Sequence, residues 1–215
     1  MKEIREDLKE YVEREIIPRY NCFDKAHDVR HAMTVIEQSL QLSVHYPVDT
    51  EMVYAAAAYH DTGLAEGREI HHLASGRIIR EDSNLRRWFT EEEIETIACA
   101  AEDHRASSGH PPRSIYGRIV AEADRIIDPE TIIRRTVQYG LSHYPELDRE
   151  GHWKRMLEHM KEKYAEGGYL KLWIPESPNA QRLKAFRTDI LGNPTKLRAL
   201  FDKAFDENAS TERTR

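Results

Sequence analysis

Four polar residues, spread over three segments of the sequence, lie on or beside apolar helical stripes: His31, His60, Asp61 and Asp124. A charged group on such a stripe must find a partner, because an unpaired buried charge is costly. Two imidazoles and two carboxylates form a mixed donor set that suits Mn, Fe, Co, Ni, Zn or Mg and leaves coordination positions open for water. A bound cation lowers the pKa of its water and offsets charge on a phosphoryl oxygen, which favours metal-assisted hydrolysis. For each residue alone, a salt bridge or a structural hydrogen bond is the alternative.

The sequence contains a second His-Asp pair, His27-Asp28, and the surroundings separate it from His60-Asp61. Four alanines at residues 55–58 precede His60, and such small side chains favour close packing of a helix around that pair. For Asp28 we expect a supporting role, in which its carboxylate holds His31 or another ligand in its tautomer. The alternative for Asp28 is an acid at the N-terminus of a helix.

The elements that must position these residues are helices. Apolar residues recur at helical spacing, and proline, glycine and capping signals separate the runs. Thr90-Glu91-Glu92-Glu93, for example, is a capping box that predicts a helix from there to about His104. The patterns predict helices over residues 4–16 with an end near Pro18, 29–44, 49–61, 69–82, 90–104, 115–127, 129–144, 148–165, 179–191 and 194–205, and a loop over 167–178 in which 169–174 is a candidate extended piece.

Strands do not alternate with helices in this pattern, and the sequence shows no internal repeat and no shift of composition. The sequence therefore predicts an all-α protein, a helical bundle of one domain over residues 1–207. A motif-bearing core spans about residues 20–140, and C-terminal helices follow over 141–207. Residues 208–215 are polar and are expected to form a flexible tail.

With these residues in view, the sequence resembles the HD-domain superfamily of metal-dependent phosphohydrolases, in particular its small bacterial members. The family's skeleton is a histidine, a His-Asp pair and a distant aspartate on a helical bundle, which correspond here to His31, His60-Asp61 and Asp124. The flanks are similar as well: His27-Asp28-Val29-Arg30-His31 resembles the family's HDxxH opening, residues 55–63 resemble its apolar run with the His-Asp pair and a glycine, and Glu122-Ala123-Asp124-Arg125 resembles its aspartate segment. The resemblance implies a single HD-type domain with one or two divalent metal ions per chain.

Two more histidines, His71 and His104, decide how many ions the site holds. The segment that His71 opens resembles the corresponding segment of HD proteins with two metals, and the loop after His104 is faintly similar to theirs. The resemblance then implies six ligands, with Asp61 bridging two ions. The alternative is that His71 or His104 binds substrate phosphate or caps a helix without a metal. A histidine left free of metal could protonate the leaving oxygen, so Asp61, His71 and His104 are the candidate catalytic residues.

Arginine forks suit phosphate oxygens, and several arginines lie near these histidines in the sequence. The candidates for binding the substrate phosphate are Arg77, Arg105 and Arg125, with Arg80 and Arg113 as further cations. For each arginine the alternative is a solvated surface position.

Composition narrows the class of partner. The net charge over 215 residues is 32 − 38 = −6, which argues against binding duplex nucleic acid through phosphate contacts. Cys22 and Cys99 form no CxxC pattern, which excludes a disulfide scaffold. The charged N-terminal segment does not resemble a secretory signal, and the longest uncharged stretch, residues 52–60, is too short to cross a bilayer. We therefore expect a cytoplasmic protein with no membrane partner.

Three function classes remain open at this point. The first is hydrolysis of a phosphate ester or anhydride in a small phosphorylated substrate, a nucleotide or dinucleoside polyphosphate. The second is an HD-type di-iron oxygenase, because some HD relatives use nearly the same ligands to activate oxygen. The third is a non-catalytic metal or nucleotide sensor. A homodimer is a candidate assembly. The aromatic residues that could line a base pocket, or instead form core or dimer contacts, are Trp153, Tyr164, Tyr169, Trp173 and Phe186.

Overall fold

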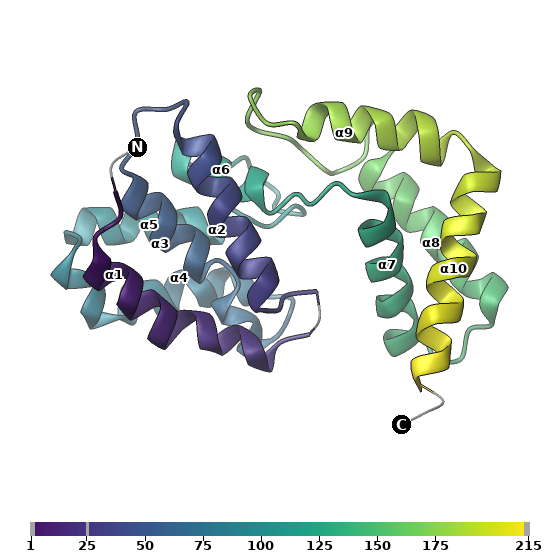
Figure 1. Ribbon diagram of the computed structural model, residues 1–215, viewed down its shortest axis with the longest axis horizontal. Helices are drawn as coiled ribbons and strands as arrows, with labels where there is room; N and C mark the ends of the chain where they lie inside the picture. The colour runs from purple at the N-terminus through teal and green to yellow at the C-terminus, as the bar shows by residue number, and fades with distance from the viewer. Residues whose placement is uncertain (1–2, 25, 213–215) are drawn as a thin grey trace. The chain divides into compact units, whose positions relative to one another are not determined.

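The computed structural model describes residues 3–24 and 26–212, and every regular element in this part of the chain is helical, which confirms the all-α prediction. The α-helices are α1 (Glu6–Tyr11), α2 (Val29–Ser43), α3 (Thr50–Tyr59), α4 (His71–Glu81), α5 (Glu91–Glu102), α6 (Ile115–Ala123), α7 (Pro129–His143), α8 (Arg149–Tyr164), α9 (Asn179–Ala185) and α10 (Pro194–Glu212), as labelled in Figure 1. Shorter turns of 3₁₀- or π-helix lie at Val12–Ile16, Ile17–Cys22, Thr62–Glu66, Ser83–Arg87 and Phe186–Leu191. None of the helices in the described ranges combines the length and the apolar character needed to span a membrane.

The chain forms two compact units. The first unit comprises Met1–Arg125 and Leu172–Ser177, and the second comprises Ile126–Lys171 and Pro178–Arg215. Helices α1 to α6 belong to the first unit, and α7 to α10 belong to the second. That residues 1–207 act as one HD-type domain stays a prediction.

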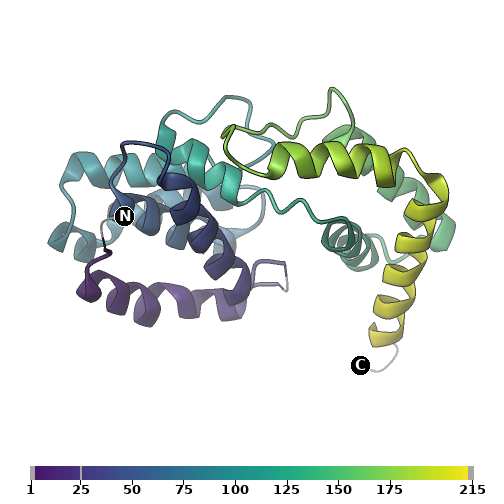
Figure 2. The ribbon, with the colours of Figure 1, turned by 45° about the horizontal axis from the view of Figure 1, so that its top comes forward.

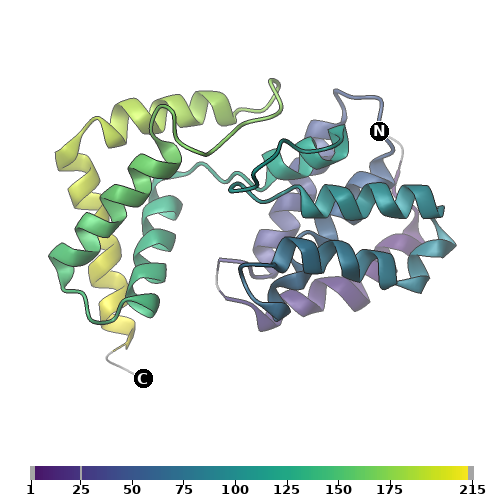
Figure 3. The same ribbon diagram turned by 180° about the vertical axis from the view of Figure 1, so that it is seen from behind.

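Helix α3 is the centre of the first unit. All of its residues are buried, including the four alanines at 55–58, which have no exposed surface. Their small side chains let α2, α5 and α6 approach α3 closely. Figure 3, the view from behind, shows α4 and α5 side by side in the same unit. Because α3 is enclosed, the residues at its C-terminal end lie inside the unit.

Side-chain caps define where most of these helices begin. Thr90 and Glu93 form the predicted capping box at the start of α5. Five other caps accept a hydrogen bond from a backbone N–H in the first turn of their helices: Asp28 for α2, Asp49 for α3, Ser114 for α6, Asp128 for α7 and Asp148 for α8. The caps replace partners that the first N–H groups of a helix lack, so the sequence predicts these starts to within two residues.

Three predicted helix ends are wrong, and one predicted helix changes type along its length. The helix predicted over 115–127 ends at Ala123, and Ile126 and Ile127 lie in the link to α7. Helical turns continue past Pro18 to Cys22, because Pro18 stands in the first turn of a 3₁₀-helix, where a missing N–H costs nothing. The predicted helix at 179–191 changes from α9 to a π-helix at Phe186, although the two form one continuous rod in Figure 2. Helix α10 extends to Glu212, because residues 206–212 contain no glycine or proline. Residues 213–215 of the predicted tail lie outside the described residues.

The segment Leu172–Ser177 belongs to the first unit, although the residues directly before and after it in the sequence belong to the second. Glu122 in α6 is fully buried, and its Oε2 accepts hydrogen bonds from the backbone N–H groups of Trp173 at 2.6 Å and Ile174 at 3.4 Å. Tyr46 also donates to Glu176 at 2.5 Å. The sequence predicts a loop here with a candidate extended piece over 169–174, and the structure contains no strand within residues 167–178.

In the second unit, α7 packs against both α8 and α10. Three of the five aromatic residues considered for a base pocket pack in this unit: Tyr164 lies edge-on against Phe186, with ring centroids 5.4 Å apart, and Trp153 packs in the same way on Phe201 at 5.2 Å. Tyr169 is exposed, and Trp173 belongs to the first unit. Tyr164 and Phe186 are buried in these contacts. For these residues the structure favours the core role over the pocket.

Candidate metal centre

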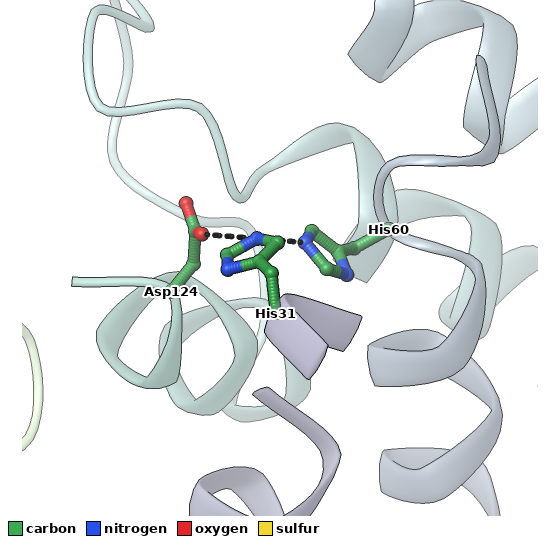
Figure 4. A group of neighbouring side chains, drawn as sticks. All are labelled: His31, His60 and Asp124. Atoms are coloured by element: carbon green, nitrogen blue, oxygen red, sulfur yellow. Dashed lines mark hydrogen bonds and ion pairs between the residues drawn. The ribbon is translucent and has the colours of Figure 1, made fainter. Parts of the chain in front are cut away.

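The structure brings the six predicted ligands together in the first unit. His31, His60 and Asp124 each point one donor atom into a common space, with these atoms within 4.8 Å of one another, and Asp61, His71 and His104 do the same. Figure 4 shows the first group: His31 lies between His60, 3.2 Å away between their Nε2 atoms, and Asp124, whose Oδ1 is 3.3 Å from His31 Nε2. Donor atoms that share an ion at ~2.0–2.3 Å stand roughly 3.0–3.5 Å apart, so these separations suit a bound cation.

The carboxylate of Asp61 lies between the two groups. Its Oδ2 is 3.1 Å from His60 Nε2 and 3.4 Å from His31 Nε2. Its Oδ1 is 3.3 Å from His104 Nε2 and 3.5 Å from His71 Nε2. Each oxygen therefore faces one pair of histidines, which is the arrangement that a carboxylate bridging two ions requires.

Backbone carbonyls fix the orientation of three of the four imidazoles. The Nδ1 atoms of His60, His71 and His104 lie 2.8, 2.7 and 2.5 Å from the carbonyl oxygens of Ala57, Arg68 and Ala101, three residues earlier in each case. A carbonyl only accepts, so Nδ1 carries the proton in each ring and Nε2 is left with its lone pair.

These lone pairs face one another. The Nε2 atoms of His71 and His104 are 3.1 Å apart, although neither holds a proton in the tautomer that the carbonyls select. Two lone pairs at this distance repel unless a cation lies beside them. Holding the second ring nitrogen of a histidine in this way is also how proteins orient metal ligands. The donor set and its orientation therefore fit a divalent metal.

The pKa shifts of the residues in the centre also favour a bound cation. Burial raises the pKa of Asp61, but the neighbouring imidazoles His60 and His104 outweigh it and hold the pKa well below its usual range. Burial likewise acts against ionisation of Asp124, whose pKa is nevertheless lowered by His31. Burial lowers the pKa of His31, and the two carboxylates outweigh this and raise it to about 9. Two ionised carboxylates in a buried place demand compensating positive charge, which a divalent cation supplies.

The pKa of His71 moves in the opposite direction. Burial, and then electrostatic repulsion from the neighbouring His104 imidazole, lower it to about 4. His71 is therefore a neutral imidazole at neutral pH, which is the form that binds a metal.

Gly63, two residues after Asp61, lets the start of α4 approach the centre. A Cβ atom at Gly63 would overlap the carbonyl oxygen of His71 and lie 2.5 Å from the amide nitrogen of Ser75. The Gly63 N–H also donates to the Ser75 hydroxyl at 2.9 Å. Close approach of two backbones at this point places His71 opposite His104.

Replacing Gly63 by alanine is expected to destabilise the protein by about 3 kcal/mol, because the methyl group meets backbone atoms that cannot rotate away. Gly109→Ala is the matched control, since a Cβ atom there has nothing within 4 Å, and its effect should stay within about 0.5 kcal/mol. Urea unfolding of the two variants measures the difference. Equal stabilities would show that α4 is not held against Gly63.

Asp28 differs from its expected role. Its Oδ1 accepts a hydrogen bond from the backbone N–H of His31 at 2.9 Å and caps α2, while the His31 Nδ1 atom is buried with no hydrogen-bond partner among the described residues. The predicted contact with the His31 ring is not formed, and the N-terminal acid is the alternative that the structure supports. Asp28 has this contact because its position directly before α2 directs its short side chain to the first turn.

The predicted phosphate-binding arginines fall into two groups. Arg125 is buried beside the centre, where it donates to the carbonyl of His104 at 2.8 Å and lies 3.5 Å from Asp124 Oδ2. Arg105 follows His104 directly and donates to the carbonyl of Glu69, just before α4. By contrast, Arg77 is paired with Glu66 and Glu81 on the surface.

Arg80 and Arg113 are also held by carboxylates. Arg80 binds Glu95 and Glu102, and Arg113 binds Glu102 and Asp103. A phosphate at Arg77, Arg80 or Arg113 would have to displace an acid that already neutralises the guanidinium. The arrangement favours Arg105 and Arg125 among the five candidates.

Sequence reasoning missed Tyr20. Its ring is fully buried against His60, with centroids 6.2 Å apart, and its hydroxyl reaches the backbone on either side of that histidine. Tyr20 follows Pro18, where the apolar pattern ends, and it lies 41 positions before Asp61, so no local signal connects the two.

Comparison with known proteins identifies the segment that carries the centre. Residues 28–127 match the family model described as the HD domain, and this range contains all six residues of the two groups. Neither the curated proteins nor the solved structures contain a match to the chain.

Proposed function

Since the chain belongs to the HD-domain superfamily through residues 28–127, we propose that it is a metal-dependent phosphohydrolase. Its proposed reaction is cleavage of a phosphate ester or anhydride in a small substrate, a nucleotide or dinucleoside polyphosphate. The observation that carries the proposal is the position of Asp61, with one carboxylate oxygen toward each pair of histidines. Two adjacent cation sites of this kind suit displacement at phosphorus.

In the proposed centre, Asp61 serves both sites. His31, His60, Asp124 and Asp61 Oδ2 would hold one ion, and His71, His104 and Asp61 Oδ1 would hold the second. A divalent cation held there lowers the pKa of a bound water and offsets negative charge on the phosphoryl oxygens. The donor set admits Mn, Fe, Mg, Co, Ni or Zn.

The chain's own residues supply orientation and further charge. With His71 and His104 as ligands, their Nδ1–H groups keep donating to the carbonyl oxygens of Arg68 and Ala101. Positive charge for the phosphoryl group then comes from Arg125, beside Asp124, and from Arg105, which binds the carbonyl of Glu69. Phosphoryl transfer depends mainly on positioning and charge stabilisation, so the proposed reaction needs no covalent bond between the protein and the phosphoryl group. The cytoplasmic location, the homodimer and the absence of a nucleic-acid partner stay predictions.

The proposal is tested by elemental analysis of the purified protein, followed by a phosphate-release screen over nucleotides with Mn²⁺, Mg²⁺ or Co²⁺. We expect bound metal, phosphate release with at least one nucleotide, and loss of that release after chelation. Iron-dependent oxygen uptake without phosphate release would favour the oxygenase. Tight metal binding with neither activity would favour the sensor.

A further inference from the structure

The end of α3 is held by three side chains. Three successive carbonyl oxygens in its last turn each accept a hydrogen bond from a side chain: Ala57 from the His60 ring at 2.8 Å, Ala58 from the Tyr20 hydroxyl at 2.9 Å, and Tyr59 from the Thr62 hydroxyl at 2.7 Å. The last carbonyls of a helix lack partners within the helix, and burying them unpaired is costly. The helix can therefore end inside the protein, with His60 and Asp61 just beyond its last residue.

Tyr20 binds the backbone at two places, on both sides of His60. Its hydroxyl also accepts a hydrogen bond from the backbone N–H of Asp61 at 3.3 Å. One hydroxyl thus binds the chain before and after His60, and the ring packs on the imidazole itself. Tyr20 has no exposed surface, and the edge of its ring meets Phe23 at 5.5 Å, so its position is fixed by packing.

The position of the Asp61 backbone decides where its carboxylate lies. Asp61 has left the helix, with φ −109° and ψ 4°, so the helical hydrogen bonds no longer define its conformation. Its two oxygens must nevertheless stay within 3.1–3.5 Å of four Nε2 atoms. Sites of this kind require placement to within about 0.5 Å, which depends on groups that hold the ligand from behind.

We propose that Tyr20 is a positioning residue of the metal centre: its hydroxyl fixes the Asp61 backbone and thereby places the shared carboxylate between the two pairs of histidines. This inference rests on the metal centre of the proposed function. It concerns metal affinity, and it is independent of which substrate the protein cleaves.

The test replaces Tyr20 by phenylalanine, which removes the hydroxyl and keeps the ring that fills the core. Co²⁺ titration followed by visible absorption should show affinity weakened about 10–100-fold, the usual effect of removing a group that orients a metal ligand. The Co²⁺ absorption bands should also change in shape, because the ligand geometry relaxes.

Tyr59→Phe is the matched control. Tyr59 is also a fully buried tyrosine, from the same end of α3, but its hydroxyl donates to Asp82 at 2.6 Å rather than to the turn that carries Asp61. Both variants lose a buried hydroxyl hydrogen bond, so both should melt at a lower temperature than the wild type. We expect Tyr59→Phe to keep the Co²⁺ affinity and absorption spectrum of the wild type.

Unchanged Co²⁺ affinity in Tyr20→Phe would overturn the inference, and so would equal losses of affinity in the two variants, which indicate a purely structural role. If Tyr20→Phe is only marginally stable, the rise of its Tm with Co²⁺ concentration still reports affinity. Wild-type protein that binds Co²⁺ but releases no phosphate would refute hydrolysis and leave the role of Tyr20 standing. Wild-type protein that binds no Co²⁺ would refute both.

Discussion

Asp61→Ala is expected to leave the protein without bound metal and to reduce phosphate release to the background of the assay. The variant removes the one carboxylate whose oxygens face both pairs of histidines. Without it, His71 and His104 form a two-ligand site, and the first group loses one of two negative charges that hold a divalent cation. Elemental analysis and the phosphate-release assay measure the two effects separately.

Asp28→Ala is the control for this experiment, because it removes the aspartate of the other His-Asp pair. Its carboxylate binds the backbone N–H of His31, and the Nδ1 atom of that ring has no hydrogen-bond partner among the described residues, so the metal content should be unchanged. Loss of the cap should lower the free energy of unfolding by about 0.5–2 kcal/mol. Complete loss of metal in Asp28→Ala would show that the wrong pair has been assigned to the centre.

The second large effect is expected for His71→Ala, whose metal-to-protein ratio should fall to half of the wild-type value. His71 belongs to the group with His104, whereas His31, His60 and Asp124 remain complete in the variant. One ion should therefore stay bound and the other should be lost, and activity should fall because two cations are needed to clamp the phosphoryl group.

His72→Ala provides a neighbouring histidine for comparison. His72 follows His71 in α4 and belongs to neither group of donor atoms, so its removal should change neither metal content nor turnover. If His71→Ala instead keeps the full metal content and raises KM, then His71 contacts the substrate phosphate and the centre holds one ion. The ratio of metal to protein alone separates these outcomes.

Much of the centre is predictable because the candidate ligands are polar residues at positions that are usually apolar. His31, His60, Asp61 and Asp124 are polar groups on apolar stripes, and burial of such groups requires partners. The helix starts are predictable for a similar reason, since the caps, such as Thr90 with Glu93, are local in sequence.

The features that the sequence does not predict depend on contacts between segments that are distant in the sequence. Tyr20 looks like an ordinary core residue until α3 is folded against it. Glu66 and Glu95, which bind Arg77 and Arg80, likewise come from other turns and helices. The change from α- to π-helix at Phe186 has no signal in the composition of the segment. Propensity and periodicity describe single segments and do not contain this information.

Glu122 sets a limit on where the chain can be shortened. The family match ends at residue 127, and a protein cut there would look complete by motif, because every candidate ligand is retained. It would nevertheless lack residues 172–177, and Glu122 would lose two backbone N–H donors while its neighbour Asp124 faces the centre. The stability of the unit that carries the candidate centre therefore depends on a short segment that begins 45 residues after the end of the family match (172 − 127). Supplied separately as a peptide, that stretch becomes a natural candidate for complementation of the truncated chain.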